Sequence, residues 1–319
     1  MAVYTEVTAE ELEAMLARYD IGALASFKGI AEGVENSNYF LGTERGQYIL
    51  TLYERRVSRD DLPFFIGLMV HLAGAGISCP KPIADRAGRV LQELAGRPAA
   101  IVTFLNGYAV RRVKAEHCEA VGRALAALHL GGAGFALMRR NTLSLDGWSQ
   151  IFADLNGEPE HLQPGMTEEL AREIASLRAR WPTGLPSGVI HADLFPDNVF
   201  FLGNEVSGLI DFYFACNDIF AYDIAICMNA WCFELDHAFN VTKARALLRG
   251  YGAVRPLARD EIEALPALAR GAALRFLLTR VYDWFNTPSS AMVQRKDPME
   301  YWRKLRFHRT VTTASAYGI

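Results

Sequence analysis

Three polar side chains near the middle of the chain have the types and the spacing that phosphoryl transfer from ATP requires. They are Asp193, Asn198 five residues later, and Asp211 thirteen residues after that. In this chemistry one carboxylate accepts the proton of the attacking hydroxyl, while an amide and a second carboxylate hold Mg²⁺ against the phosphates. The spacing predicts Asp193 as the catalytic base and Asn198 and Asp211 as the metal ligands of a kinase that uses ATP and Mg²⁺.

The segments around these residues have the pattern of short strands joined by turns. One strand ends before Asp193, a second begins after Asn198, and Gly203-Asn204 turns the chain into a third that ends before Asp211. All three side chains then lie on loop edges beside a rigid hairpin, which suits a catalytic site. The simpler interpretation is a hairpin with a capping Asp and a turn Asn. It is disfavoured because the apolar residues around Asp211 would bury an unpaired carboxylate.

Two other polar residues of this segment are given no chemical role. His191 precedes the loop, and a single His in that place more often supports the backbone than reacts. We therefore expect it to hydrogen-bond the loop backbone. Asp197 is expected to be exposed.

The elements before this segment alternate short strands with turns. Thr8 and Glu11 form a capping box that begins a short helix over residues 8–19. Strands are predicted at residues 24–30, 37–42, 47–54, 90–94 and 99–104, and a helix at 60–74. Helical periodicity dominates from Glu116 onward, with an exposed loop at 156–168. The pattern predicts an α+β protein with a five-stranded antiparallel sheet in a domain of residues 1–105 and a mostly helical domain of residues 106–319.

The sheet-containing part also has candidate nucleotide-binding residues. Backbone N–H groups of a glycine-containing turn between two strands can cradle phosphates, and the segment that follows the last strand can bind adenine. The candidates are Gly33, Asn36, Ser37 and Asn38 at the turn, and Phe104 and Leu105 at the connector. Ordinary hairpin chemistry explains the turn equally, and strand packing explains the connector.

Composition excludes several classes of function. The chain has 319 residues, of which 51% are hydrophobic, and a net charge of −3. This balance predicts a well-packed globular protein that binds neither nucleic acid nor an anionic membrane. Five cysteines without a C-x-x-C pair are expected to be reduced core residues. Since no secretory signal precedes the first helix, the cytoplasm is the expected compartment. Nothing in the sequence predicts an oligomeric state.

The catalytic motif and its surroundings resemble the aminoglycoside phosphotransferase-like kinases, a superfamily that includes choline kinases and a bacterial class of homoserine kinase. The motif is His191-x-Asp193-x-x-x-x-Asn198 with Ile210-Asp211-Phe212. Residues 125–129 resemble the helix that packs under the catalytic loop. Residues 221–225 resemble the helix that follows this loop in the family, whose Asp, at position 223 here, braces the loop. The resemblance implies a bilobal, protein-kinase-like fold with a small antiparallel N-terminal lobe, a larger helical C-terminal lobe and ATP between them.

Within the superfamily, four segments look like homoserine kinase: residues 33–40, 48–54, 228–233 and 296–301. This likeness implies that the acceptor is the side-chain hydroxyl of L-homoserine and that the product is O-phospho-L-homoserine, used in threonine biosynthesis. Another small alcohol, such as choline, ethanolamine or methylthioribose, is the alternative acceptor. A nucleotide-binding pseudokinase is the alternative of another class.

One position departs from the superfamily pattern. Most members carry a Lys on the third strand that pairs with the α- and β-phosphates, and Thr51 stands at the matching position here. The charge of the phosphates must then be offset by Mg²⁺, by backbone N–H groups of residues 31–37, or by a cation such as Lys28, Arg55 or Arg56. The pseudokinase alternative depends on this missing Lys alone.

The acceptor site is less evident in the sequence. An amino-acid acceptor needs a cation for its carboxylate and an anion for its ammonium, and Arg280 and Asp283 lie three apart on one helix. Pairing of these two with each other is the favoured interpretation. Aromatic residues of the C-terminal half are mostly expected in the core, although a choline cage would use the same types. The 14 Lys/Arg against 10 Asp/Glu after residue 213 disfavour a polycationic acceptor.

Overall fold

The computed structural model describes residues 5–30, 36–54, 58–287 and 295–319. Its N-terminal part is an antiparallel sheet with the strand order β1-β2-β3-β5-β4. The elements are α1 (Ala9–Leu16), β1 (Leu24–Gly29), β2 (Ser37–Thr43), β3 (Gly46–Leu52), α2 (Leu62–Gly74), β4 (Gln92–Leu94) and β5 (Arg97–Thr103). The five strands and the helix predicted at 60–74 are confirmed within two residues of their ends, whereas the helix predicted over residues 8–19 ends at Leu16.

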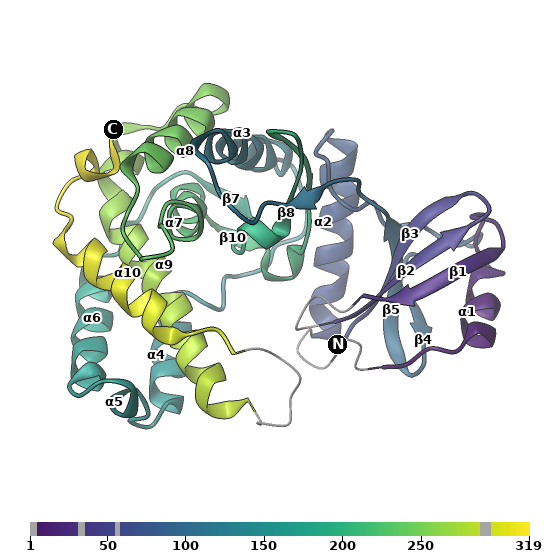
Figure 1. Cartoon of the computed structure of the whole chain (residues 1–319), viewed down its shortest axis with the longest axis horizontal. Coiled ribbons are helices and arrows are strands. Elements are labelled where there is room, and N and C mark those ends of the chain that lie inside the picture. Colours follow the sequence, from purple (N-terminus) through teal and green to yellow (C-terminus); the bar gives the residue numbers. More distant parts are fainter. Residues whose placement is uncertain (1–4, 31–35, 55–57, 288–294) are drawn as a thin grey trace.

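The two faces of this sheet meet different neighbours. Alternation along the strands places Tyr39, Leu50 and Ile101 on the face that packs with α1 in a small separate core. The capping box of Thr8 and Glu11 starts α1 as predicted. The opposite face turns toward α2, which lies between the sheet and the helical part of the molecule (Figure 1).

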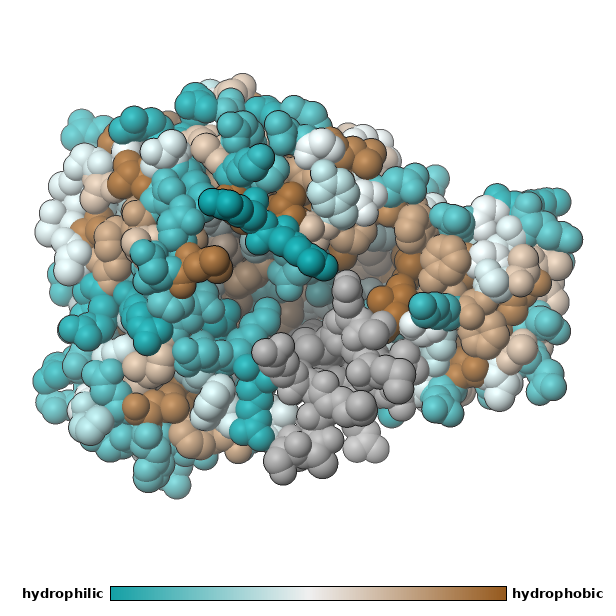
Figure 2. All heavy atoms as spheres, in the orientation of Figure 1, coloured by the Kyte–Doolittle hydropathy of each residue, from teal (hydrophilic) through white to brown (hydrophobic). Residues whose placement is uncertain are grey.

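The rest of the chain is mostly helical, which confirms the α+β class. Its helices are α3 (Ala115–Gly131), α4 (Leu145–Asp154), α5 (Pro159–Leu162), α6 (Met166–Arg180), α7 (Phe220–Trp231), α8 (Val241–Val254), α9 (Arg259–Asn286) and α10 (Pro298–Thr310). Among the described residues the small strands here are β6 (Tyr108–Ala109), β7 (Ser187–Ile190), β8 (Val199–Leu202), β9 (Glu205–Leu209) and β10 (Cys216–Ile219). Figure 2 shows the surface hollowed between this part and the sheet.

Two glycines let α3 and α8 approach closely. A Cβ atom on Gly122 would lie 2.1 Å from the carbonyl oxygen of Leu247, and one on Gly250 would lie 2.1 Å from that of Glu119. Neither position can accept a side chain without separating the helices. Of this pair, α3 contacts β7 and β9, the small strands beside the loops that carry the candidate catalytic residues.

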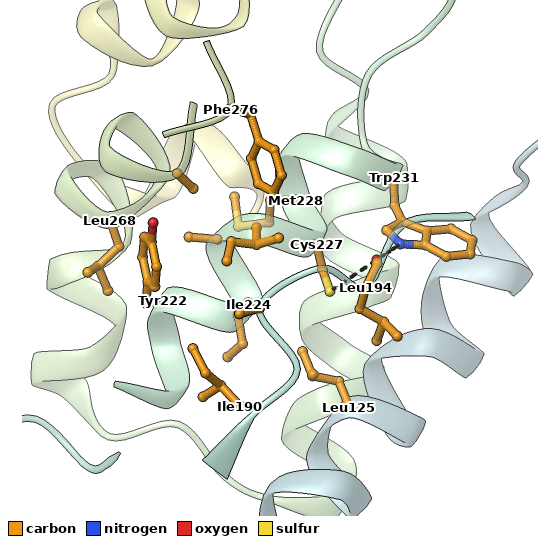
Figure 3. Packing of buried hydrophobic residues seen from close by; sticks show 14 of the residues in the cluster. Leu125, Ile190, Leu194, Tyr222, Ile224, Cys227, Met228, Trp231, Leu268 and Phe276 are labelled. Carbon is orange, nitrogen blue, oxygen red and sulfur yellow. Dashed lines mark hydrogen bonds between the residues drawn. The ribbon is translucent and has the colours of Figure 1, made fainter. Parts of the chain in front are cut away.

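The largest core extends across both parts of the molecule. It includes Leu62 and Phe65 of α2, Ala100 of β5, and the buried faces of the C-terminal helices. Figure 3 shows the part of this core beneath the loop at 191–198, where Leu194 points into the helices. Since residues of α2 and β5 belong to the same core as the C-terminal helices, this core is not interrupted at residue 105. The division into domains of residues 1–105 and 106–319 stays a prediction.

Three details complete the comparison with the sequence. The stretch 156–168, expected as an exposed loop, instead contains the short helix α5 and the start of α6, because the Pro at 159 is compatible with the first turn of a helix. All five cysteines are buried and free, as predicted. Within the described ranges, no helix is long and apolar enough to cross a membrane.

Candidate active site

The first two candidate catalytic residues lie in direct contact. The Asn198 amide nitrogen donates to the Asp193 backbone carbonyl at 2.8 Å and to its carboxylate at 3.2 Å. Asn198 is the last residue of a short 3-10 turn that begins at Pro196, and the turn brings it back onto Asp193. Its nitrogen is thereby directed to Asp193, which leaves the amide oxygen as the atom available to a cation.

The third candidate, Asp211, is held beside Asp193 and Asn198 by hydrogen bonds of the preceding residue, Ile210. The Ile210 backbone N–H donates to the Asn198 carbonyl at 3.0 Å, and the Ile210 carbonyl lies 3.0 Å from the buried ring nitrogen Nε2 of His191. Asp211 itself has a φ of 64°, a left-handed conformation that Asp tolerates better than most residues. The structure thus brings the three predicted residues together, and His191 contacts the loop backbone as expected.

Asp223 fixes the start of the catalytic loop. Its carboxylate accepts from the backbone N–H groups of His191 at 2.7 Å and Ala192 at 2.9 Å, and from His129 at 3.1 Å. Burial raises the pKa of this carboxyl, but these donors and the adjacent rings outweigh burial and hold the pKa below its usual value. The contact implied by the family resemblance is therefore present, in a fully buried network.

Two side chains of α7 hold the middle of the same loop. The indole nitrogen of Trp231 donates to the Leu194 carbonyl at 2.7 Å, and the Cys227 thiol lies 3.8 Å from that oxygen (Figure 3). Trp231 belongs to the segment 228–233 that the sequence singled out. Its function in this structure is to position the residue that follows Asp193.

Arg275 is a buried cation beside the base that the sequence did not reveal. It is 2% exposed, its guanidinium donates to the Ala192 carbonyl, and it lies over the rings of Phe214 and Phe276. Ala192 has a φ of 63°, an unfavourable conformation for a residue with a Cβ. The hydrogen bond from Arg275 helps to maintain this conformation.

Burial dominates the electrostatics of the candidate base. It raises the pKa of Asp193 to about 6, while the charges of Arg275 and Lys296 lower it in part. Asp197 is mostly exposed, as predicted, with Lys296 at 3.9 Å. A carboxylate with this pKa is ionised at neutral pH yet basic enough to accept a proton.

This pKa predicts the pH dependence of the reaction. If Asp193 is the base, it can accept a proton only when it is ionised, so the activity would require a pH above this pKa. We expect kcat/KM to fall about tenfold per pH unit below pH 6. The measurement is the steady-state rate from pH 5 to 8, corrected for the protonation of ATP over this range. The residual rate of the Asp193→Asn variant should not fall in this way below pH 6. If the fall persists in that variant, it reports the titration of another group.

The candidate metal ligands suit Mg²⁺ by their chemistry. Asn198 and Asp211 offer an amide oxygen and a carboxylate, the hard oxygen donors that this ion prefers. No group of three or more His, Cys, Asp or Glu residues gathers as a metal site in the described segments. One amide and one carboxylate suit an ion that is shared with phosphates, since Mg²⁺ usually keeps waters and binds phosphate oxygens besides one or two carboxylates.

The candidate phosphate-binding turn is only partly described, since Gly33 lies outside the described residues. Asn36 accepts from the backbone N–H of Glu54 at 3.2 Å, and Ser37 donates to the Glu54 carboxylate at 2.7 Å. These two side chains anchor the start of β2 to the end of β3. Asn38 lies on the other face of the sheet, where it accepts from the Thr51 hydroxyl at 2.8 Å.

The position of the missing lysine is thus filled by a neutral pair. Thr51 is buried and hydrogen-bonded to Asn38, on the sheet face opposite α1. Lys28 is exposed on β1, and Arg55 and Arg56 lie outside the described residues.

The connector candidates lie at the end of β5. The backbone N–H of Phe104 donates to the Gln47 carbonyl at 3.3 Å, and its ring meets that of Phe40 edge to face at 5.6 Å. Leu105 packs against Gly208 of β9, where a Cβ would approach within 2.7 Å of the leucine side chain. Both side chains therefore have packing roles, and adenine binding would use their backbone groups.

The expected pairing of Arg280 with Asp283 is wrong. Arg280 instead forms an ion pair with Glu300 at 2.6 Å and donates to the Asp297 carbonyl at 3.1 Å. Lys304 also binds Glu300 at 2.5 Å, and the two cations hold the pKa of that carboxyl at about 2 against the effect of burial. Docking of α10 on α9 decides this arrangement, which spacing along one helix cannot predict.

Comparison with known proteins places this geometry in context. Residues 26–257 match the model of the family described as phosphotransferase enzyme family. The chain is 63% identical to a homoserine kinase of Xanthobacter autotrophicus, over all of this chain and 99% of that one. It is 62% identical to a homoserine kinase of Rhodopseudomonas palustris and 58% to one of Agrobacterium fabrum, again over the whole chain and 98–99% of the relatives.

Solved structures show the same fold at low identity. An amicoumacin kinase in complex with AMP-PNP matches with a TM-score of 0.70 at 15% identity, covering 96% of this chain and 94% of that one. A choline kinase from Cryptosporidium parvum matches with a TM-score of 0.69 at 13% identity, covering 95% of both chains. The bilobal architecture implied by the sequence is confirmed.

Proposed function

The chain belongs to the phosphotransferase enzyme family, and we propose that it transfers the γ-phosphoryl group of ATP to the side-chain hydroxyl of L-homoserine. Identity of about 60% to homoserine kinases over the full length carries this assignment. The contact of Asp193 with Asn198, and the link from Asn198 to the residue before Asp211, support the same chemistry. The product, O-phospho-L-homoserine, belongs to threonine biosynthesis. The reduced, buried cysteines support the cytoplasm as the compartment.

Asp193 is the proposed base of the reaction. Its carboxylate orients the acceptor hydroxyl and takes the proton as the bond from oxygen to the γ-phosphorus forms and the bond to the β-phosphate oxygen breaks. Because the transition state is loose, the proton moves late and positioning matters more than basicity. Asn198 keeps the Asp193 carboxylate in place through its amide nitrogen. Asp223, Trp231 and Arg275 hold the loop that carries it.

Asn198 and Asp211 are proposed to bind Mg²⁺ through their oxygens. When bound, the ion supplies positive charge against the β- and γ-phosphates. Asn38 is proposed to bind the phosphates, and Gly33, which lies outside the described residues, stays a predicted phosphate-binding residue. Backbone groups of Phe104 and Leu105 are proposed to face adenine.

A comparison of acceptors tests the substrate. Homoserine offers a carboxylate and an ammonium for recognition, and it exceeds serine by one methylene, worth about 1–3 kcal/mol. We expect serine to be a poor substrate, 3-aminopropanol to be poorer because it leaves a buried cation unpaired, and choline to be inert. ADP release with each acceptor gives kcat/KM.

The ranking separates the alternatives. If choline or 3-aminopropanol exceeds homoserine, the acceptor assignment is wrong and the kinase assignment stands. A pseudokinase would turn over none of the four.

A further inference from the structure

A pocket of about 240 Å³ adjoins the catalytic loop on the side of α2. It lies between the start of α2, the segment before α4, the residues just after Asp211, and α9. The lining residues that matter here are Asp61, Phe65, Arg139, Tyr213, Phe214 and Arg275. Four separate parts of the chain therefore converge on one small space with two cations, one carboxylate and aromatic walls.

Arg139 and Asp61 are adjacent in this pocket and each keeps a free bonding position. Arg139 donates from Nε to an Asp61 oxygen at 2.8 Å and from Nη1 to the Ala215 carbonyl at 3.2 Å, with its guanidinium 5.0 Å from the Phe65 ring. In the described part of the chain, Nη2 of Arg139 and the second Asp61 oxygen have no hydrogen-bond partner. The pair thus offers a ligand one hydrogen-bond donor, Nη2 of Arg139, and one acceptor, the second oxygen of Asp61.

Arg275 forms the end of the pocket nearest to the base. Its guanidinium donates to the carbonyl of Ala192, the residue before Asp193, while its buried Nε makes no hydrogen bond in the described structure. A buried donor without a partner is unfavourable, so this end of the pocket favours an occupant that carries an acceptor atom. Phe214 lies against Arg275, with the ring centre 5.5 Å from the guanidinium carbon.

We propose that this pocket binds the α-amino acid end of the acceptor, with the carboxylate on Arg139, the ammonium on Asp61, and the hydroxyl directed toward the catalytic loop. This inference rests on the proposed function and adds the residues that select an amino acid. The volume admits a four-carbon amino acid, and Phe65 and Phe214 offer apolar contact to its methylenes. The carboxylate and the ammonium, both attached to the α-carbon of the acceptor, match the adjacent cation and anion.

Arg139→Met and Asp61→Asn test the assignment, with Arg140→Met as the matched control. Arg140 is 79% exposed and pairs with Asp146 on the surface. We expect each pocket variant to raise the KM for homoserine about 30-fold or more, since each leaves a charge of the bound acceptor unpaired. The KM for ATP should change less than about twofold, and the control should match the parent enzyme.

The outcomes separate this inference from the proposed function. A parent enzyme inactive on homoserine contradicts the proposed function. An active parent whose two pocket variants keep the parental homoserine KM contradicts the acceptor pocket alone, and so does a variant that raises the KM for ATP equally. If Arg139→Met unfolds, as thermal melting would show, Arg139→Lys and Asp61→Asn carry the test. Arg139→Lys keeps the charge and should rescue part of the homoserine KM.

Discussion

Asp211→Ala should bring turnover below detection at any attainable Mg²⁺ concentration. Asp211 is the only carboxylate among the proposed metal ligands, so its removal deletes the charge that holds the ion at the β- and γ-phosphates. The amide oxygen that remains cannot replace it, because Mg²⁺ loses its hydration waters reluctantly and a neutral ligand does not offset that cost. The measurement is ADP formation across a range of Mg²⁺ concentrations at saturating ATP and homoserine.

Asn198→Ala provides the graded comparison. It removes a neutral ligand, so we expect a smaller loss of activity that raised Mg²⁺ partly restores. The same substitution removes the hydrogen bonds to Asp193 at 2.8 and 3.2 Å, so full restoration is not expected. Measurable turnover of Asp211→Ala, or an Asn198→Ala activity that does not respond to the Mg²⁺ concentration, would show that the substituted residue is not a metal ligand.

Asp193→Asn should lower kcat by about 10²–10⁴-fold, the contribution of a positioned proton acceptor. The amide is nearly isosteric with the carboxylate and the loop is fixed by Asp223 and Trp231, so the fold and ATP affinity should be retained. Rapid-mix or steady-state kinetics with homoserine give kcat, and nucleotide titration gives the affinity.

Asp197→Asn is the matched control for this variant. Asp197 lies in the same loop and is 68% exposed, with Lys296 at 3.9 Å from its carboxylate. We expect its kcat to stay within about twofold of the parent value, as for most surface substitutions. A kcat above half the parental value in Asp193→Asn would remove Asp193 from the role of base.

Much of the fold could be predicted from the sequence because its signals are local. Alternating apolar residues and turn residues define the strands of the sheet, and the Thr8–Glu11 capping box defines the start of α1. The hairpin turn at Gly203-Asn204 sets the register of β8 and β9. Asp193 and Asn198 are five residues apart in one short loop, so their contact also follows from local geometry. The sequence by itself thus determined the architecture and the candidate catalytic set.

The surroundings of that set were decided by tertiary structure alone. Arg275 sits within the 28-residue helix α9, where no local pattern distinguishes a buried arginine that reaches a loop 83 residues away from a surface one. Asp61 and Arg139 are 78 residues apart and meet only because α2 packs on the C-terminal core. Arg280 finds Glu300 on another helix, although Asp283 is closer along the chain. Spacing along the chain predicts contacts within one element or turn, whereas an acceptor pocket is assembled from side chains that only the packing of distant elements brings together.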